Sequence, residues 1–268
     1  MQCGGSDESF IRKHATNNLS SAATLFEWNT FSSPHLASRL EDKPVSDKEV
    51  LKALSVTLDD LGASARQNLS VAGNRSTNNA TRDSIWIETA GGVMSPSSSS
   101  PDNQNIYHAK NGTGGWGWMT QVDLYKGFRD RASVVLVGDG RLGGISSTLT
   151  ALETLLHRNY SVMGILLLDQ DTGSDKESDR ILCNSNLEAL REYVSTISAS
   201  NSDNQSLLRT TTAGMFANLE KSIISLPALP PEPEPLNEWF DSSDVQDKMT
   251  CFVHEHLFES YAIDHARS

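Results

Sequence analysis

Residues 133–158 read SVVLVGDGRLGGISSTLTALETLLHR, and this stretch decides the fold class. Its β-branched apolar run predicts a buried strand over residues 134–137. Gly138, Gly140 and Gly143 follow with the spacing Gly-x-Gly-x-x-Gly, and apolar residues at helical spacing come next. A strand, a glycine turn and a helix in this order are the sequence form of a dinucleotide-binding turn.

The turn supports more than one interpretation. Asp169, at the end of the next apolar run, stands where the ribose-binding acid of a dinucleotide site is expected. Asp139 and Arg141 lie beside the phosphate path, however, and Gly144 delays the start of the helix. An ordinary strand-to-helix turn is therefore an alternative to an NAD(P) site.

Other strands and helices extend the same pattern along the chain. Short apolar runs predict strands over residues 84–87, 162–168 and 222–226. Residues 46–63 predict an amphipathic helix that opens with a capping box of Ser46 and Glu49. A last helix is predicted over residues 245–262. Alternating strands and helices indicate an α/β fold with a doubly wound parallel sheet.

Three segments have the composition of loops. Residues 68–82 are rich in Asn, and residues 95–117 are rich in Ser, Asn and Gly, so both are expected to be surface insertions. Residues 227–235 read PALPPEPEP and must lie extended.

Charge and cysteine content exclude several classes of protein. The 268 residues carry a formal charge of -12 and contain no cluster of Lys and Arg, which disfavours nucleic-acid binding. No apolar run is long enough to cross a bilayer. Cys3, Cys183 and Cys251 are far apart, so they indicate neither a disulfide framework nor a zinc site. We expect a reducing compartment.

Glu88 is the strongest candidate metal ligand in the sequence. It follows the apolar residues 84–87 and precedes Thr89, Ala90, Gly91 and a second glycine. A carboxylate at the end of a parallel strand suits Mg²⁺, and the glycines let backbone N–H groups approach phosphates. The alternative is an ordinary surface or capping acid.

Taken together, several segments resemble the dethiobiotin synthetase family, especially the synthetase half of bifunctional eukaryotic members. The matching segments are QCGGSDESFI from Gln2, TLFEWNTFSSPHLAS from Thr24, IETAGGVMSP from Ile87, VDLYKGFR from Val122, the run from Val134 to Asp169, and LPALPPEPEPLNEWF from Leu226. The resemblance implies a P-loop NTPase-like fold and a biotin-biosynthesis ligase. Its reaction converts 7,8-diaminopelargonate, CO₂ and MgATP into dethiobiotin, ADP and phosphate.

The resemblance also implies roles for individual residues. Glu88 would bind Mg²⁺, with Asp7 as the second acidic ligand and Glu8 as its alternative. The phosphates of ATP would lie along Glu88, Thr89, Ala90 and Gly91. The residues expected to line the adenine and ribose are Asp169, Pro227, Ala228, Leu229 and Glu234. Leu168 replaces a polar residue that contacts adenine in the family, which leaves base selectivity open.

The remaining implied roles concern the substrate and the assembly. Cys3 stands where the family has a Ser or Thr that touches the substrate. Gly144, Ile145 and Ser146 would open a helix whose N–H groups accept the substrate carboxylate across a homodimer interface. The family also implies a mitochondrial location, with the cytoplasm as the alternative. Residues 1–240 would form the synthetase-like domain, and residues 241–268 a C-terminal helix or a linker to an aminotransferase domain.

One feature of the family is absent from the printed sequence. It contains no Gly-x-x-x-x-Gly-Lys-Ser/Thr run and no Lys-Pro pair before QCGG, where the family has its catalytic lysine. We therefore expect an N-terminally truncated synthetase without its first strand, P-loop and first helix, and with impaired activity. An NAD(P)-binding protein and a non-catalytic dimerising fragment are the two alternatives.

Overall fold

The computed structural model describes residues 2–3, 8, 11–12, 22–71, 85–103, 117–141, 143–169, 176–203, 219–230 and 236–253. The chain divides into two compact units, Met1–Lys126 and Gly127–Ser268. No helix among these residues is both long and apolar enough to cross a membrane.

The second unit is built on a parallel sheet of three strands in the order β3-β4-β5. The strands are β3 (Ser133–Asp139), β4 (Ser161–Leu168) and β5 (Ile223–Leu226), and each coincides closely with a strand predicted from the sequence. In β4, Val162, Ile165 and Leu167 are almost completely buried, as expected for a sheet covered on both faces.

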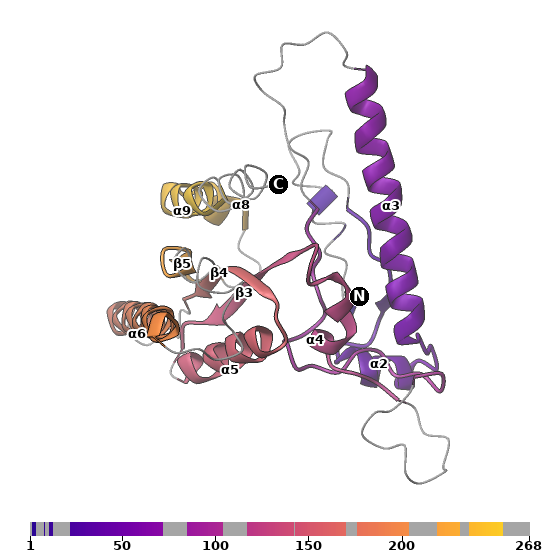
Figure 1. The fold of residues 1–268 in the computed structure, drawn as a ribbon, viewed down its shortest axis with the longest axis horizontal. Helices are drawn as coiled ribbons and strands as arrows, with labels where there is room; N and C mark the ends of the chain where they lie inside the picture. Colours follow the sequence, from indigo (N-terminus) through magenta and orange to yellow (C-terminus); the bar gives the residue numbers. More distant parts are fainter. Residues whose placement is uncertain are drawn as a thin grey trace. The chain divides into compact units, whose positions relative to one another are not determined.

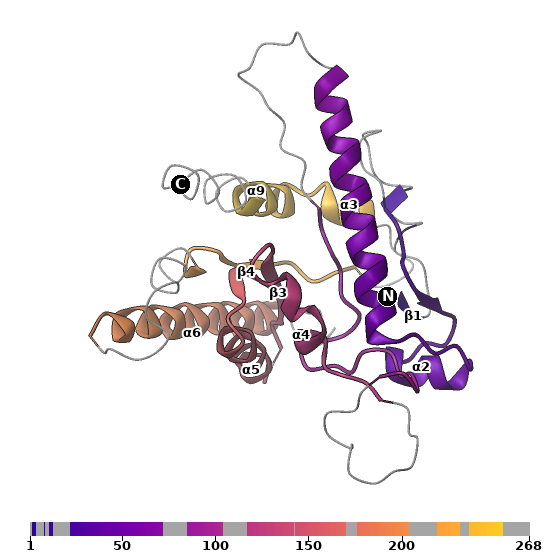
Figure 2. The same cartoon turned by 45° about the vertical axis from the view of Figure 1, so that its right-hand side comes forward.

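Helices cover this sheet on both faces. Helices α5 (Gly144–His157) and α6 (Lys176–Asp203) lie on one face, and α9 (Ser243–Val253) lies on the other (Figures 1 and 2). The short helix α8 (Leu236–Phe240) precedes α9. The unit is thus an α/β fold with a parallel sheet and flanking helices, as the sequence predicts. The part of the last predicted helix beyond Val253 lies outside the described residues.

The first unit contains the long helix α3 (Asp47–Val71), visible in Figure 1, and the shorter helix α2 (Pro34–Leu40). Ser33 and Pro34 start α2 as an N-cap and first-turn proline. Strands β1 (Gln2–Cys3) and β2 (Glu27–Trp28) pair in parallel. Helix α4 (Gln121–Leu124) leads into the 3₁₀ helix η1 (Tyr125–Phe128), where the second unit begins.

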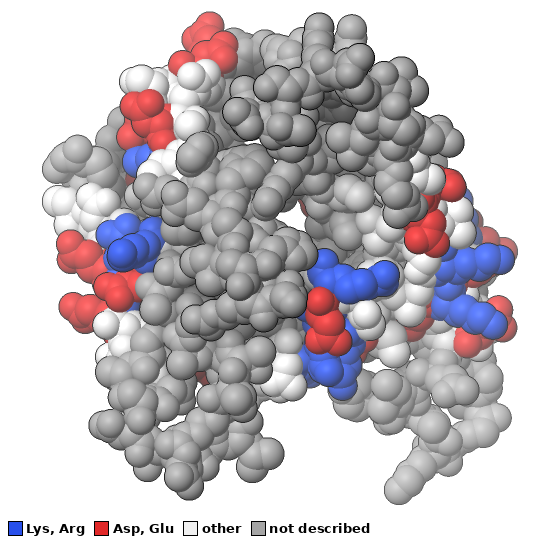
Figure 3. Space-filling view, turned by 45° about the horizontal axis from the view of Figure 1, so that its top comes forward, with Lys and Arg blue, Asp and Glu red and all other residues white. Residues whose placement is uncertain are grey.

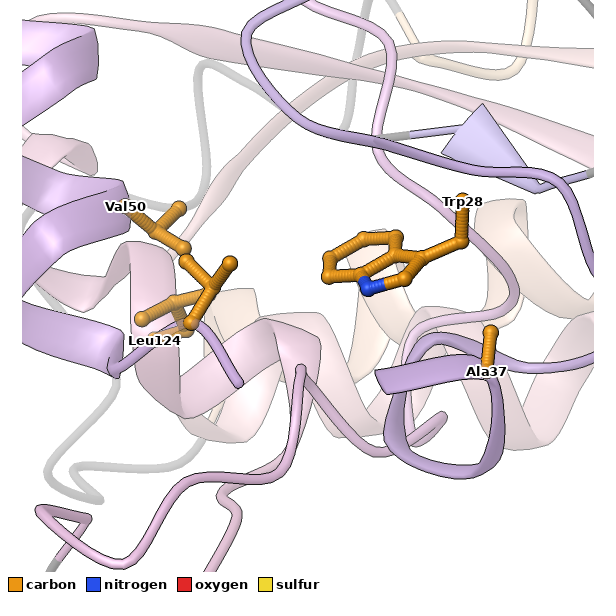
Figure 4. Packing of buried hydrophobic residues seen from close by; sticks show 5 residues of the cluster. Trp28, Ala37, Val50 and Leu124 are labelled. Atoms are coloured by element: carbon orange, nitrogen blue, oxygen red, sulfur yellow. The ribbon is translucent and has the colours of Figure 1, made fainter. Parts of the chain in front are cut away.

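A small apolar core holds the first unit together. Trp28, Ala37, Val45, Val50 and Leu124 are buried against one another. Figure 4 shows Val50 and Leu124 on one side of the Trp28 ring and Ala37 near its base. The indole Nε1–H donates to the carbonyl of Lys43 at 3.1 Å, so the largest buried side chain also has its polar atom satisfied.

The capping box predicted at the start of α3 is confirmed. Glu49 Oε2 accepts from the Ser46 N–H at 2.7 Å, and Ser46 Oγ accepts from the Glu49 N–H at 3.2 Å. The helix continues to Val71, so the prediction of a loop starting at residue 68 is wrong. Ala, Arg, Gln and Leu in residues 63–69 are good helix formers, and they outweigh the polar composition.

The Ser-rich segment is not a surface insertion over its first residues. Ser97, Ser98 and Ser99 are completely buried, and two isolated antiparallel bridges join this segment to residues 117–120. Asn103 Nδ2 donates to the carbonyls of Ser98 and Gly117, at 3.0 and 3.1 Å. Composition misses this burial because hydroxyl and amide groups are stable inside a protein once they are hydrogen-bonded.

Acidic and basic side chains are interspersed where the surface is described. On the face shown in Figure 3, the Lys and Arg side chains lie beside Asp and Glu side chains. Arg141 pairs with Asp139, and Lys248 pairs with Asp244.

Candidate functional site

The carboxyl ends of β3, β4 and β5 bring several predicted site residues to one edge of the sheet. Asp139, Leu168 and Leu226 end the three strands in register with their neighbours. The hydrogen bonds between the strands continue one residue past β3 and β4. The Gly140 N–H donates to the Leu168 carbonyl and the Asp169 N–H to the Leu226 carbonyl, both at 3.0 Å. Ligands of parallel α/β proteins bind at this edge.

The predicted nucleotide residues follow directly from these strand ends. Asp169 and Leu168 are half-buried, as are Pro227 and Ala228 after β5. Leu229 is 48% exposed, and residues 227–230 form neither helix nor strand. The extended course predicted for the proline-rich segment is thus compatible with the part that is described. Glu234 lies outside the described residues.

The turn after β3 carries a tight ion pair. Arg141 Nε lies 3.0 Å from both carboxylate oxygens of Asp139, and Nη2 lies 2.8 Å from Oδ2. This guanidinium holds the pKa of the Asp139 carboxyl below its usual range. The negative charge of Asp139 is therefore balanced locally, so it opposes an anion at the nearby helix end less strongly.

Helix α5 begins as the sequence predicts, after Gly143. This residue has φ +87°, a left-handed conformation that favours glycine. A Cβ on Gly144 would collide with the carbonyl of Asp139, so a second glycine is needed where the turn closes. Gly144 N–H donates to the Arg141 carbonyl at 2.8 Å, and Ser146 N–H donates to the Gly143 carbonyl at 3.1 Å. An anion here would share these two donors with the backbone.

Two residues of α6 support this turn, and the sequence analysis did not identify them as site residues. Asn186 is buried, and its Nδ2 donates to the carbonyls of Gly140 and Arg141 at 2.9 and 3.1 Å. The Cys183 thiol lies one helical turn away, where burial, and then the charge of Asp169, raise its pKa to about 11. The sequence contains one signal for this role: Asn186 lies three residues after Cys183 and four before Leu190, so a polar residue occupies the buried face of the helix.

The segment around Glu88 differs from its prediction. Residues 85–89 form no strand, and Ile85, Trp86 and Ile87 are 49%, 58% and 41% exposed. A strand requires a hydrogen-bonded neighbour, and the described residues of the first unit supply a ladder only between β1 and β2. The apolar run therefore predicted the strand wrongly. Glu88 and Thr89 are exposed.

A compact turn follows Glu88. Gly91 has φ +80°, and a Cβ there would lie 2.8 Å from Ser95 Oγ. Gly92 N–H donates to Ser95 Oγ at 2.8 Å, and Ser95 N–H donates back to the Gly92 carbonyl at 2.9 Å. The glycines predicted to approach phosphates therefore form a closed turn, in which the N–H of Gly92 already has an acceptor.

The two alternatives for the second acidic ligand differ in what is described of them. Glu8 Oε1 accepts from Arg12 Nε and Oε2 accepts from the Thr24 N–H, both at 2.8 Å. These hydrogen bonds lower the pKa of Glu8, with the one from Thr24 contributing most. Both oxygens of Glu8 are thus engaged within the protein. Asp7 and the side chain of Cys3 lie outside the described part of the chain.

No group of three His, Cys, Asp or Glu side chains that could hold a metal occurs among the described residues. Mg²⁺ usually has one or two carboxylate ligands and takes its others from water and phosphate oxygens, so a site containing Glu88 needs no such group. The exposed carboxylate of Glu88 fits that mode of binding.

The fold and this edge define an α/β protein with strand ends of the kind that bind nucleotides and small anions. Comparison of sequences gives a narrower result. Two plant proteins, from rice and Arabidopsis thaliana, are each named "Bifunctional dethiobiotin synthetase/7,8-diamino-pelargonic acid aminotransferase, mitochondrial". The rice protein is 37% identical over 155 residues, and the Arabidopsis protein is 35% identical over 147 residues.

A fungal protein from Emericella nidulans is 33% identical over 165 residues and is named "Bifunctional dethiobiotin synthetase/adenosylmethionine-8-amino-7-oxononanoate aminotransferase". These matches cover 57%, 54% and 62% of this chain, for the rice, Arabidopsis and fungal proteins respectively. They span only 14–16% of the length of those relatives. No family model matches the chain. The chain contains a dethiobiotin synthetase-like region.

Proposed function

We propose that this chain carries the dethiobiotin synthetase function for which its relatives are named. In that reaction an amine of 7,8-diaminopelargonate is carboxylated, ATP phosphorylates the carbamate, and the second amine closes the ring and releases phosphate. The observation that carries the proposal is 33–37% identity to three proteins named as synthetases.

The chemistry of the described residues supports a nucleotide role for the sheet edge. Asp169 would accept hydrogen bonds from ribose hydroxyls, while Pro227, Ala228 and Leu229 would contact the base. The proposal includes Glu234 for the same nucleotide. A half-buried acid and the apolar residues that follow β5 suit a ligand with one polar and one flat apolar part.

We assign the metal role to Glu88, with Asp7 as its partner in preference to Glu8, since both oxygens of Glu8 are engaged. Thr89, Ala90 and Gly91 would border the phosphates. Bound Mg²⁺ would offset the charge of the phosphates and of the developing anions. Glu88 would hold the metal, and the closed Gly91–Gly92 turn would fix the backbone beside it.

The substrate role falls to Gly144, Ile145 and Ser146, with Cys3 as a further contact. Helix α5 has its positive end at Gly144, and the neutralised Asp139–Arg141 pair lies close to it in sequence. A carboxylate would gain from this helix end and from the exposed Ser146. We propose a homodimer in which this helix end serves the partner's site, and a mitochondrial location like that of the plant relatives.

Turnover can be measured as incorporation of labelled bicarbonate into dethiobiotin, with diaminopelargonate and MgATP present. Because the printed 268 residues contain no phosphate-binding Gly-x-x-x-x-Gly-Lys-Ser/Thr run, we expect turnover at least about a hundredfold higher when an N-terminal extension supplies that loop and a Lys-Pro pair. Equal, Mg²⁺-dependent turnover without the extension would show that the expectation of impairment is wrong.

Two controls test the function itself. In the protein that carries the N-terminal extension, called the active form below, Glu88→Gln should abolish turnover. Asp59→Asn, at another acid of the first unit, should not. Titration with NADH should show no binding, because the relatives of this region are named as synthetases. Micromolar NADH binding that Gly140→Val removes would favour the dinucleotide alternative instead.

A further inference from the structure

Asp47 is a buried carboxylate that the proposed reaction does not use. It is the first residue of α3 and is only 9% exposed. Its Oδ1 accepts from Ser97 Oγ at 2.6 Å, and its N–H donates to Asn103 Oδ1 at 2.7 Å. Ser97 and Asn103 both belong to the Ser-rich segment, 50 and 56 residues further along the chain.

Ser97 connects this carboxylate to a second segment. Its hydroxyl oxygen accepts from the Met119 N–H at 3.1 Å, and its own N–H donates to the Met119 carbonyl at 2.7 Å. Ser97 therefore uses its hydroxyl in two directions, toward Asp47 and toward Met119. The side chain is completely buried, so water does not compete for these bonds.

Hydrogen bonds between residues 93–97 and 119–122 also hold the turn that follows Glu88. Gln121 N–H donates to the Ser95 carbonyl at 2.9 Å, and Val122 N–H donates to the Val93 carbonyl at 3.1 Å. Ser95 in turn holds Gly92 through its hydroxyl. These hydrogen bonds, joined by the short backbone stretches 95–97 and 119–121, connect the start of α3 with the Gly91–Gly92 turn.

We propose that Asp47 and Ser97 are positioning residues that fix the segment of residues 88–92 for its role beside the metal and the phosphates. The inference rests on the proposed function. Neither residue touches the ligands; both act through Ser95 and the Gly91–Gly92 turn. Burial raises the pKa of Asp47, because it disfavours the charged carboxylate. An apolar residue at this position would not lower the stability of the folded protein in this way.

The chain offers a matched control for Ser97. Ser98 is adjacent and equally buried, yet within the part of the chain that the structure describes its hydroxyl donates only to the carbonyl of Ser99, at a long 3.5 Å. Ser97→Ala and Ser98→Ala remove the same atom at the same depth. Ser98→Ala therefore controls for the loss of a buried hydroxyl, whereas only Ser97→Ala breaks the bonds to Asp47 and Met119. A positioning role is separated from a general loss of stability by the kinetics, since it lowers kcat/KM for MgATP and leaves the KM for diaminopelargonate unchanged.

The test combines backbone dynamics with kinetics. NMR order parameters of Gly91 and Gly92 should fall toward the flexible range, below about 0.6, in Ser97→Ala, and should stay near the wild-type values in Ser98→Ala. Ser97→Thr, which keeps a hydroxyl, should restore them. In the active form, Ser97→Ala should lower kcat/KM for MgATP about tenfold to a hundredfold, with the KM for diaminopelargonate unchanged.

The two failures are distinguishable. Equal order parameters in the two alanine variants, or an equal loss of kcat/KM, would overturn the positioning role. Failure of the extended wild-type protein to form dethiobiotin would instead overturn the proposed function, and full activity of Glu88→Gln would overturn the metal role assigned to Glu88, whatever the order parameters show.

Discussion

At the scale of single residues, Asp47 stands apart because its carboxyl pKa is raised, whereas the pKa values of Glu49 and Asp139 are lowered. Burial raises its pKa above the ordinary 3.8, and the hydrogen bond from Ser97 offsets only part of this. The pKa values of Glu49 and Asp139 are lowered, because Ser46 and Arg141 donate hydrogen bonds to their carboxylates. The folded protein therefore binds the proton of Asp47 more tightly than the unfolded chain does.

Replacing Asp47 by Asn should change how stability depends on pH. A raised folded-state pKa makes the free energy of unfolding fall as pH rises from about 3.8 through the folded-state value. Asp47→Asn lacks this loss, so its stability relative to wild type should increase across the interval. The gain is about 1.4 kcal/mol for each unit that separates the two pKa values. Urea denaturation at several pH values measures it, and a constant difference would contradict the prediction.

The two glycines at the start of α5 have different reasons to be glycine. Gly143→Ala should cost about 1–2 kcal/mol, since only its positive φ is at stake and, chain neighbours aside, no atom of the described residues lies within 4 Å of the new Cβ. Gly144→Ala should cost more, about 3 kcal/mol, because the Cβ meets the carbonyl of Asp139. Thermal unfolding of both variants gives the comparison. The reverse order would mean that the turn relaxes around residue 144.

At the scale of elements, the sequence predicted what depends on local pattern. The three strands β3, β4 and β5 are short apolar runs, and the α3 start has a capping box, so both were predictable. Residues 84–87 have the same pattern but no paired neighbour in the described residues, and pairing is not a local property. The burial of Ser97 and the carbonyl bonds of Asn186 depend in the same way on partners distant in sequence.

Helix α6 is expected to stabilise the β3–α5 turn mainly through the amide of Asn186. Asn186→Ala removes the donor to the carbonyls of Gly140 and Arg141, and should lower the free energy of unfolding by about 1–3 kcal/mol. It should also speed hydrogen exchange at the start of α5. Asn184→Ala, at an exposed position of the same helix, should change stability by less than about 0.5 kcal/mol. Similar losses in both variants would argue against the role of Asn186.

At the scale of the whole molecule, the chain consists of two units with buried apolar residues of their own. Trp28 and Val50 belong to the core of the first unit, while Leu152 and Ile165 are completely buried in the second. The predicted nucleotide and substrate residues are divided in the same way, with Glu88 in one unit and Asp169 and Gly144 in the other. The single synthetase-like domain that the sequence predicts over residues 1–240 stays a prediction.

A core deletion should therefore act mainly on its own unit. Leu152→Ala should cost about 2–5 kcal/mol and raise hydrogen exchange throughout β3, β4 and β5. Amides of α3 should be affected much less. Hydrogen exchange followed by mass spectrometry resolves these elements, and equal acceleration in both units would indicate that they unfold together.

The hydrogen bonds from Asn103 to the carbonyls of Ser98 and Gly117 have a consequence for protein engineering. Asn103 and the Ser100–Gly117 bridge fix both ends of the stretch between residues 103 and 117, so this stretch is attached to the described core at two defined points. Lengthening a chain segment between two fixed points is inexpensive, with a doubling costing about 0.6 kcal/mol. A reporter peptide or a fluorescent tag spliced between the anchors should therefore leave the Trp28 core folded, which makes this stretch the natural place to label the protein.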